Sequence, residues 1–156
     1  MSIDMGEVER LDGSVAAGLA TSLAQRAEAL AAIGSRLGVE HESVCSPDGS
    51  SFAGPHAERF TGYVTAERPT VGRMAGALAD AAVLLQQAGT IVEEYERERI
   101  RQEVIASEAD DAPIFGDWLG SIVAARRGDE LLGRMRSDGR LVRIAADLSA
   151  LGDGLG

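Results

Sequence analysis

The sequence predicts an all-α protein: an antiparallel hairpin of two long helices, followed by a C-terminal segment of short helices. Two long stretches repeat apolar residues at steps of three and four, which is the spacing of one helix face. Aromatic residues are only 4% of the 156 residues, whereas alanines recur in clusters, so close-packed helices are favoured over a strand-built core. A loop rich in turn residues separates the two stretches, so the helices are expected to run antiparallel.

The first helix is expected to begin at Asp4, because Glu7 lies three residues on and completes an acidic variant of the capping box. Gly38 provides a stop signal. The residues 39–55 then form a predicted loop, since Ser46–Ser51 combines polar and turn-forming residues. The apolar stripe of this helix comprises Val8, Leu11, Val15, Leu19, Leu23, Leu30, Ile33 and Leu37.

The second helix is predicted to extend from Phe60 to about Ile105. Its heptad register runs through Phe60, Val64, Glu67, Val71, Met74, Leu78, Ala81, Leu85, Ala88, Val92 and Tyr95. A repeat of 3.5 residues over this length is typical of a helix that packs on another helix. Pro69 lies inside it and is expected to kink or briefly break the helix, because it removes a backbone donor.

The sequence divides into a hairpin over residues 1–107, an acidic linker over 108–113 and an extension over 114–156. The charge balance changes at the linker: residues 1–111 carry 19 acidic and 9 basic side chains, and 112–156 carry 6 of each. Short helices are predicted over 114–127, 129–136 and 140–151. The last two are separated by a turn at Ser137–Gly139, for which a small β-hairpin is the alternative.

The first helix of this extension has a short amphipathic face. It is formed by Ile114, Phe115, Trp118, Leu119, Ile122 and Val123. The face could dock on a partner or a membrane surface. The favoured interpretation is that it folds back on the hairpin and covers exposed apolar surface.

Composition excludes several classes of protein. The net charge of −10 opposes binding to phosphate backbones, so nucleic acid is not an expected partner. No uninterrupted apolar run reaches the roughly 18 residues needed to cross a bilayer, and the N-terminus lacks the features of a secretory signal peptide. The 15 basic residues are all Arg and the chain has no Lys or Asn, which is typical of GC-rich bacterial genomes such as those of actinobacteria.

A short motif lies where the loop enters the second helix, at Phe52–Ala53–Gly54. With the two helices around it, this motif resembles the WXG family of type VII (ESX) secretion substrates, small helical hairpins with a Trp-x-Gly turn. Phe52 stands in place of the Trp, Gly54 matches the Gly, and the resemblance covers about residues 4–105. It implies that Phe52 plugs the open end of the helix pair while Gly54 permits a tight backbone approach. The alternative is an ordinary aromatic turn.

The resemblance also implies an export signal, Tyr-x-x-x-Asp/Glu, after the second helix. The candidate here is Tyr95 with Glu98, in which the acidic residue comes one position early, and Glu96 is the alternative acidic member. The strict spacing occurs at Tyr63 and Glu67, at the wrong end of the helix. An equally favoured interpretation is that residues 93–101 form a solvated charged face.

No catalytic or metal site is predicted. His41, Cys45, Asp48 and His56 lie in or near the loop, yet their spacing matches no usual zinc site. Cys45 cannot form an internal disulfide, although it could link two chains in an oxidising space. The two histidines form no evident dyad with a Ser or Cys, and no phosphate-binding loop follows a strand. We therefore expect neither enzyme activity nor a cofactor.

Two functions remain open at this stage. A two-helix hairpin leaves part of each apolar stripe facing water, so a partner is expected, either a second copy or a similar hairpin. The expected partner-binding stripe comprises Leu11, Val15, Leu19, Leu23, Val71, Met74, Leu78, Leu85 and Val92. The resemblance implies recognition by type VII secretion machinery and export without a signal peptide, as a complete substrate or as the targeting module of a longer toxin. The other function is a cytoplasmic helical adaptor that is never exported.

Overall fold

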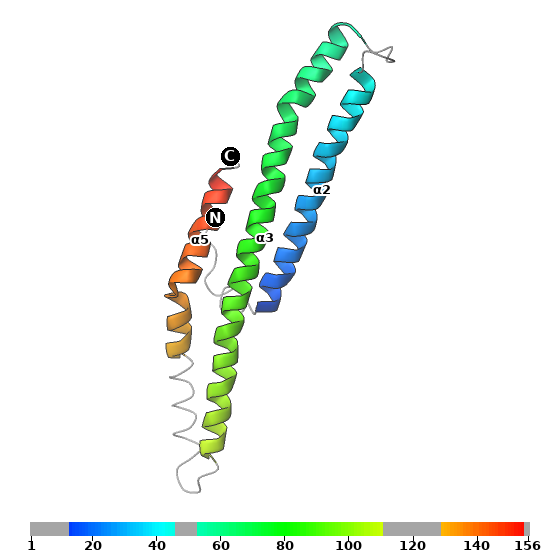
Figure 1. The fold of residues 1–156 in the computed structure, drawn as a ribbon. Coiled ribbons are helices and arrows are strands. Elements are labelled where there is room, and N and C mark those ends of the chain that lie inside the picture. The colour runs from blue at the N-terminus through cyan, green and yellow to red at the C-terminus, as the bar shows by residue number, and fades with distance from the viewer. Residues whose placement is uncertain (1–12, 46–52, 111–128, 155–156) are drawn as a thin grey trace. The chain divides into compact units, whose positions relative to one another are not determined.

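The computed structural model describes residues 13–45, 53–110 and 129–154, and these residues are helical with short turns and no strand. The predicted all-α fold class is confirmed: two long helices, α2 (Gly13–Cys45) and α3 (Pro55–Asp110), pack against each other and are followed by shorter helical segments (Figure 1). The chain divides into two compact units. Unit 1 contains residues 1–19 and 84–150, and unit 2 contains residues 20–83 and 151–156.

Helix α2 continues through Gly38 to Cys45, so the predicted stop at Gly38 and loop start at residue 39 are wrong. Gly38 is buried, and a Cβ at this position would lie 2.9 Å from Cζ of Arg68 on α3. Tertiary packing therefore offsets the cost of a helical glycine, which is about 1 kcal/mol. The predicted capping residues Asp4 and Glu7 lie outside the described residues.

Helix α3 begins at Pro55, where the fixed φ of proline suits the first helical position. Gly54 precedes it with φ of +89°, and its carbonyl accepts the Glu58 N–H at 3.2 Å. The helix continues through Pro69 without a break. It extends to Asp110, so residues 108–110, predicted as the start of the acidic linker, are helical instead.

The predicted turn at Ser137–Gly139 separates helical residues 129–136 from α5 (Gly139–Asp153), and the alternative of a β-hairpin is wrong. The Ser137 hydroxyl donates to the carbonyl of Gly133 at 3.0 Å and so satisfies a free carbonyl of the preceding helix. Asp138 caps α5: its Oδ1 accepts the N–H of Arg140 at 2.8 Å, and its carbonyl accepts the N–H of Val142 at 3.0 Å. The predicted segment 114–127, including its amphipathic face around Trp118, lies outside the described residues.

Small residues, rather than the predicted large ones, form the contact between α2 and α3. The buried apolar residues of these two helices are Ala16, Ala20, Ala27, Val64, Ala75, Ala82 and Ile91. Glycine or alanine recurs every seventh residue at positions 13, 20, 27 and 34 of α2 and at 75, 82 and 89 of α3. In unit 1, a Cβ on Gly89 would lie 3.2 Å from the carbonyl oxygen of Gly13. In unit 2, a Cβ on Gly34 would lie 3.4 Å from the side-chain atom Cγ1 of Val71. The backbones thus approach closely because side chains at the seam are small or absent.

The large aliphatic side chains lie to one side of this seam. Most follow the small positions by three residues on both helices, as Leu23 follows Ala20 and Leu78 follows Ala75, and others directly precede a small position, as Leu19 and Met74 do. Two antiparallel helices are related by an approximate twofold axis perpendicular to both, so equivalent positions fall on the same side of the pair. We call this the leucine side; it comprises Leu23, Leu30, Leu37, Val71, Met74 and Leu78 in unit 2, and Val15, Leu19, Leu85 and Val92 in unit 1.

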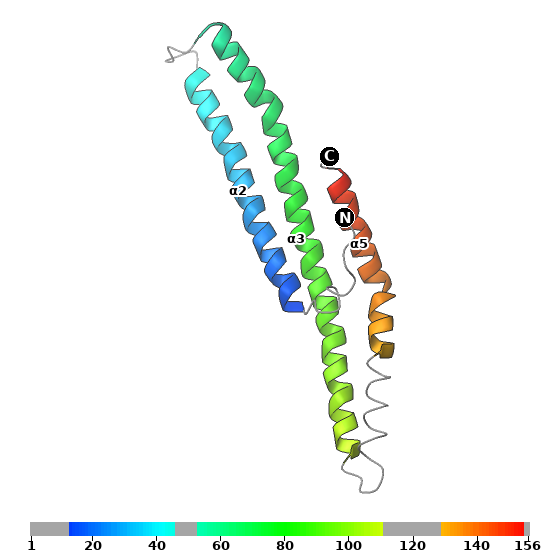
Figure 2. The same cartoon turned by 180° about the vertical axis from the view of Figure 1, so that it is seen from behind.

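Within unit 1, residues 139–150 of α5 lie beside α3, on the side away from residues 13–19 of α2 (Figures 1 and 2). Gly89 of α3 faces α2, whereas Leu84 and Ile91 line a groove together with Ile144, the buried residue of α5. Residues 84 and 91 are each about 100° around the helix from residues 85 and 92. The groove with α5 therefore uses a different face of α3 from the leucine side.

Candidate functional site

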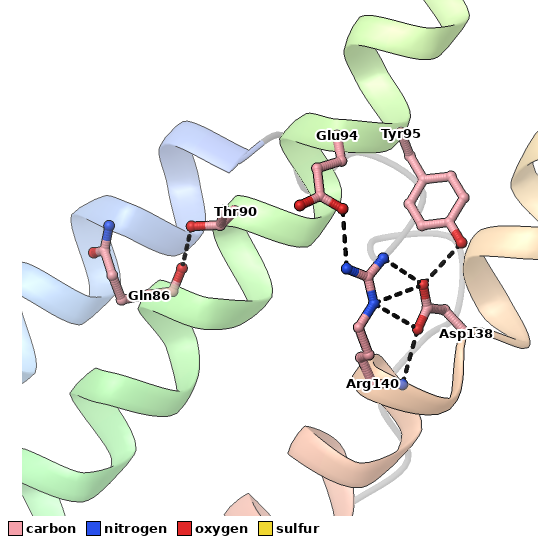
Figure 3. Close-up of polar contacts among 6 residues, drawn as sticks. All are labelled: Gln86, Thr90, Glu94, Tyr95, Asp138 and Arg140. Carbon is pink, nitrogen blue, oxygen red and sulfur yellow. Dashed lines mark hydrogen bonds and ion pairs between the residues drawn. The ribbon is translucent and has the colours of Figure 1, made fainter.

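The most connected polar group in the described residues lies where α5 meets α3 in unit 1. Tyr95 and Glu94 come from α3, Asp138 comes directly before α5, and Arg140 comes from the first turn of α5. Figure 3 shows the four side chains pointing toward one another. We call these four residues the latch, because they connect two segments that are more than 40 residues apart in the sequence.

Asp138 is the centre of the latch. The Tyr95 hydroxyl donates to its Oδ2 at 2.9 Å, and Nη2 of Arg140 donates to the same oxygen at 2.9 Å. The other oxygen, Oδ1, accepts the backbone N–H of Arg140, which makes the same carboxylate the cap of α5. Arg140 extends the group by donating from Nη1 to Oε2 of Glu94 at 3.0 Å. One carboxylate therefore both begins the helix and attaches it to α3.

The charges of the latch are mutually stabilised. Hydrogen bonds from the side chain and backbone of Arg140, and then from Tyr95, hold the pKa of Asp138 below its ordinary value of 3.8. The hydrogen bond to Asp138 and, secondly, burial raise the pKa of Tyr95 above 10.0. The two carboxylates raise the pKa of Arg140. Near neutral pH Asp138 is thus an anion and Tyr95 a neutral donor. The hydrogen bond between them therefore persists at this pH and connects α3 to the start of α5.

An open groove of about 420 Å³ adjoins the latch. Its apolar part is formed by Leu84, Ile91 and Ile144. Polar and charged side chains complete the lining: Gln87, Thr90, Arg140, Arg143 and Asp147. A space of this size beside α5 indicates that α5 and α3 are incompletely packed where they meet.

Tyr95 and Glu98, the two residues of the predicted export signal, form hydrogen bonds with different residues. Tyr95 is half-buried and donates to Asp138. Glu98 accepts from Nη1 of Arg101 at 2.9 Å and from Nε2 of Gln102 at 2.8 Å, both on its own helix. Tyr63, the tyrosine with the strict spacing, is 65% exposed at the other end of α3.

Much of the rest of residues 93–101 matches the alternative interpretation, a solvated charged face. Arg97 pairs with Glu93 and Arg101 with Glu98, both at helical spacing and with each arginine side chain at least 70% exposed. Arg99 pairs with Glu96 in the same manner. Exposed pairs of this kind stabilise a helix by only a few tenths of a kcal/mol each. Tyr95 differs from them because its partner belongs to another helix.

The predicted partner-binding stripe coincides with the leucine side. Val15, Leu19 and Met74 are exposed, at 46%, 50% and 43% respectively. The other described members of the stripe are half-buried; they are Leu23, Val71, Leu78, Leu85 and Val92. Leu11 lies outside the described residues. The stripe therefore retains apolar surface after α2 and α3 have packed.

The loop motif is described only in part. Phe52 lies outside the described residues. A Cβ on Gly54 would meet no atom of the described residues within 4 Å. What Gly54 supplies is its φ of +89°, which residues with a side chain rarely adopt.

The end of the hairpin near the loop contains His41, Cys45 and Thr61. Nε2 of His41 lies 3.0 Å from the Thr61 hydroxyl, which donates to Sγ of Cys45 at 3.7 Å. Of the other two residues considered for zinc, His56 is exposed and Asp48 lies outside the described part of the chain. Among residues the structure describes, no three His, Cys, Asp or Glu side chains are grouped as for a metal ion.

One described helix is long and apolar enough, by length and composition alone, to cross a membrane. It is the Pro55–Gln102 part of α3, with a mean hydropathy of 1.3 in an 18-residue window. The core helix of a water-soluble protein can pass the same test. In this segment Ala75 and Ala82 are buried.

No family model, curated protein or solved structure matches the chain. The resemblance to WXG hairpins therefore depends on the motif and helix lengths alone.

Sequence reasoning missed Asp138 and Arg140 as members of a site. Asp138 was visible only as part of a turn, although an aspartate directly before a helix is also a strong capping signal. Its partner Tyr95 lies 43 residues away, and no local spacing connects the two.

Proposed function

We propose that the protein is a non-enzymatic type VII (ESX) secretion substrate, or one member of a substrate pair, that acts by presenting a helical hairpin to a similar hairpin. The observation that carries the proposal is the leucine side. The α2–α3 seam is filled by Gly and Ala, and the larger aliphatic residues beside it keep exposed surface.

Apolar surface of this kind is stabilised when a second helix pair covers it. A second hairpin, placed leucine side to leucine side, would form a four-helix arrangement in which Leu23 and Leu78 become core residues. Specific interfaces of stable complexes commonly bury about 1,200–2,000 Å² in total.

The test of the interaction is the molar mass of the full chain, measured by analytical ultracentrifugation over a range of concentrations. A dimer is expected for the wild type, and Leu19→Arg should weaken association on the order of a hundredfold, because a charge would enter an apolar interface. Val39→Arg is the matched control: Val39 is 67% exposed on the same helix but lies outside the leucine side. Equal effects of the two substitutions would contradict the proposal.

Export is tested separately, by comparing culture filtrate and cell lysate of the native host. A protein that associates but stays in the cell would favour the cytoplasmic adaptor. A natural reading frame that continues into a toxin domain would make the chain a targeting module. A type VII ATPase gene nearby would favour export.

A further inference from the structure

We propose that α5 is a detachable cover over the Tyr95 hydroxyl, held closed by the latch, so that this hydroxyl is available to another protein only when α5 leaves α3. The inference rests on the proposed function in one respect: it takes Tyr95 as a recognition residue. The contact between Tyr95 and Asp138 is a property of the structure and does not depend on that function.

The first support is the position of the latch. The hydroxyl of Tyr95, its one group able to donate a hydrogen bond to a partner, is bound to the residue that begins α5. A partner that reads this hydroxyl must displace Asp138. Glu98, the acidic residue of the candidate signal, accepts hydrogen bonds from Arg101 and Gln102 of α3. Departure of α5 would leave these hydrogen bonds in place.

The second support is the shallow burial of α5 among the described residues. Ile144 is the buried residue of this helix, and the groove of about 420 Å³ lies beside it. The ion pair between Arg140 and Glu94 has side chains 55% and 49% exposed, and exposed pairs contribute little. Among the three charged side chains of the latch, only that of Asp138 is well shielded from solvent, at 10% exposure. The described part of α5 is therefore held by one shielded carboxylate at its start and by an apolar face in which Ile144 is buried and Leu141 and Leu148 are half-buried.

The third support is the covalent connection. The chain between Asp110 and Asp129 keeps α5 close to α3, so a detached α5 can rebind from a high effective concentration. A weak contact is then sufficient to keep the cover closed for most of the time. A competing partner still has access, because each opening exposes Leu84, Ile91 and Tyr95 together.

The test uses the full chain and the variant Asp138→Ser. Serine is a good helix cap, so α5 keeps its start, but its short side chain cannot replace the carboxylate that binds Tyr95 and Arg140. Arg143→Gln is the matched control, because Arg143 lines the groove without belonging to the latch. Circular dichroism checks that each protein remains helical.

Two readouts report the cover. Backbone hydrogen exchange, followed by mass spectrometry, should become faster on the order of tenfold over residues 139–153 in Asp138→Ser, while residues 20–45 are unchanged. Nitration by tetranitromethane should be slow at Tyr95 and fast at Tyr63 in the wild type, and should speed up at Tyr95 in the variant. The control should match the wild type in both.

Three results would overturn the proposal. These are unchanged exchange over 139–153, exchange that rises equally throughout the chain, and nitration of wild-type Tyr95 as fast as that of Tyr63. Failure of the proposed function gives a different pattern: α5 detaches and Tyr95 becomes reactive, yet neither association nor export changes. The cover would then stand, and Tyr95 would lose its assigned role in recognition.

Discussion

Gly13 and Gly89 face each other across the α2–α3 seam, and the Glu93 side chain also packs over Gly13. A Cβ on Gly13 would lie 2.9 Å from the carbonyl oxygen of Gly89, and one on Gly89 would lie 3.2 Å from the carbonyl oxygen of Gly13. Since backbone atoms cannot rotate away as side chains do, the contact demands glycine on both helices. It sets how closely the helices approach in unit 1.

Gly89→Leu should therefore destabilise the protein. We expect the free energy of unfolding to fall by about 1–3 kcal/mol, the usual cost of overpacking. Gly76→Leu is the control: a Cβ on Gly76 meets nothing within 4 Å, so the higher helix propensity of leucine should raise stability by a few tenths of a kcal/mol. Urea denaturation followed by circular dichroism measures both, and similar changes at the two positions would contradict the seam.

The loop gives a second prediction. Gly54→Ala should cost about 1–2 kcal/mol, because alanine is strained at φ of +89°. Gly72→Ala should instead be stabilising by about 0.5–1 kcal/mol, since Gly72 is an exposed helical residue with open space around it.

Phe52→Ala tests the aromatic plug implied by the WXG resemblance. A packed phenylalanine should contribute about 3–5 kcal/mol to the free energy of unfolding. Chemical denaturation measures the loss. A value below about 1 kcal/mol would place Phe52 on the surface and remove the main support for the resemblance.

The latch should make stability depend on pH at both extremes. The pKa of Asp138 is lowered in the folded state, so its contribution is present above pH 3.8 and is lost as the pH falls below that value. The pKa of Tyr95 is raised, so its contribution is full below pH 10.0 and is lost as the pH rises above it. Urea titrations should show wild type more stable than Tyr95→Phe by a constant margin from pH 5 to 9. A margin that does not shrink below pH 4 and above pH 10 would argue against the hydrogen bond.

Export gives a further prediction. Tyr95→Ala and Glu98→Ala should both reduce the amount of protein in the culture filtrate, whereas Tyr63→Ala should not. Tyr95→Ala also removes the latch contact, so Tyr95→Phe separates loss of the hydroxyl from loss of the ring. Folded variants that are exported as well as wild type would remove the signal assignment.

The helices themselves were predictable because the apolar period of α2 and α3 is long and regular. The residues at which the helices end were harder to predict. Gly38 appeared to be a stop, yet α2 continues through it to Cys45, and the side chain of Arg68 packs over it from the other helix. No local signal contains that information.

The core was predictable in its period but not in its members. The predicted apolar stripes included Leu19 and Met74, which are exposed, whereas Ala20 and Ala75, which the stripes left out, are buried. The recurrence of Gly or Ala every seventh residue was a readable signal, and it predicts a close seam when it occurs on both helices. The latch was not predictable, since a capping aspartate gives no indication of which distant tyrosine it will meet.

The Gly and Ala seam also has a thermodynamic consequence. Small side chains bury little apolar area, so unfolding of the isolated hairpin should have a heat capacity change below the usual value of about 12–15 cal/mol/K per residue. The larger aliphatic residues of the leucine side lose the rest of their contact with water only when a partner binds. Calorimetry should accordingly find a small heat capacity change for folding and a strongly negative one for association.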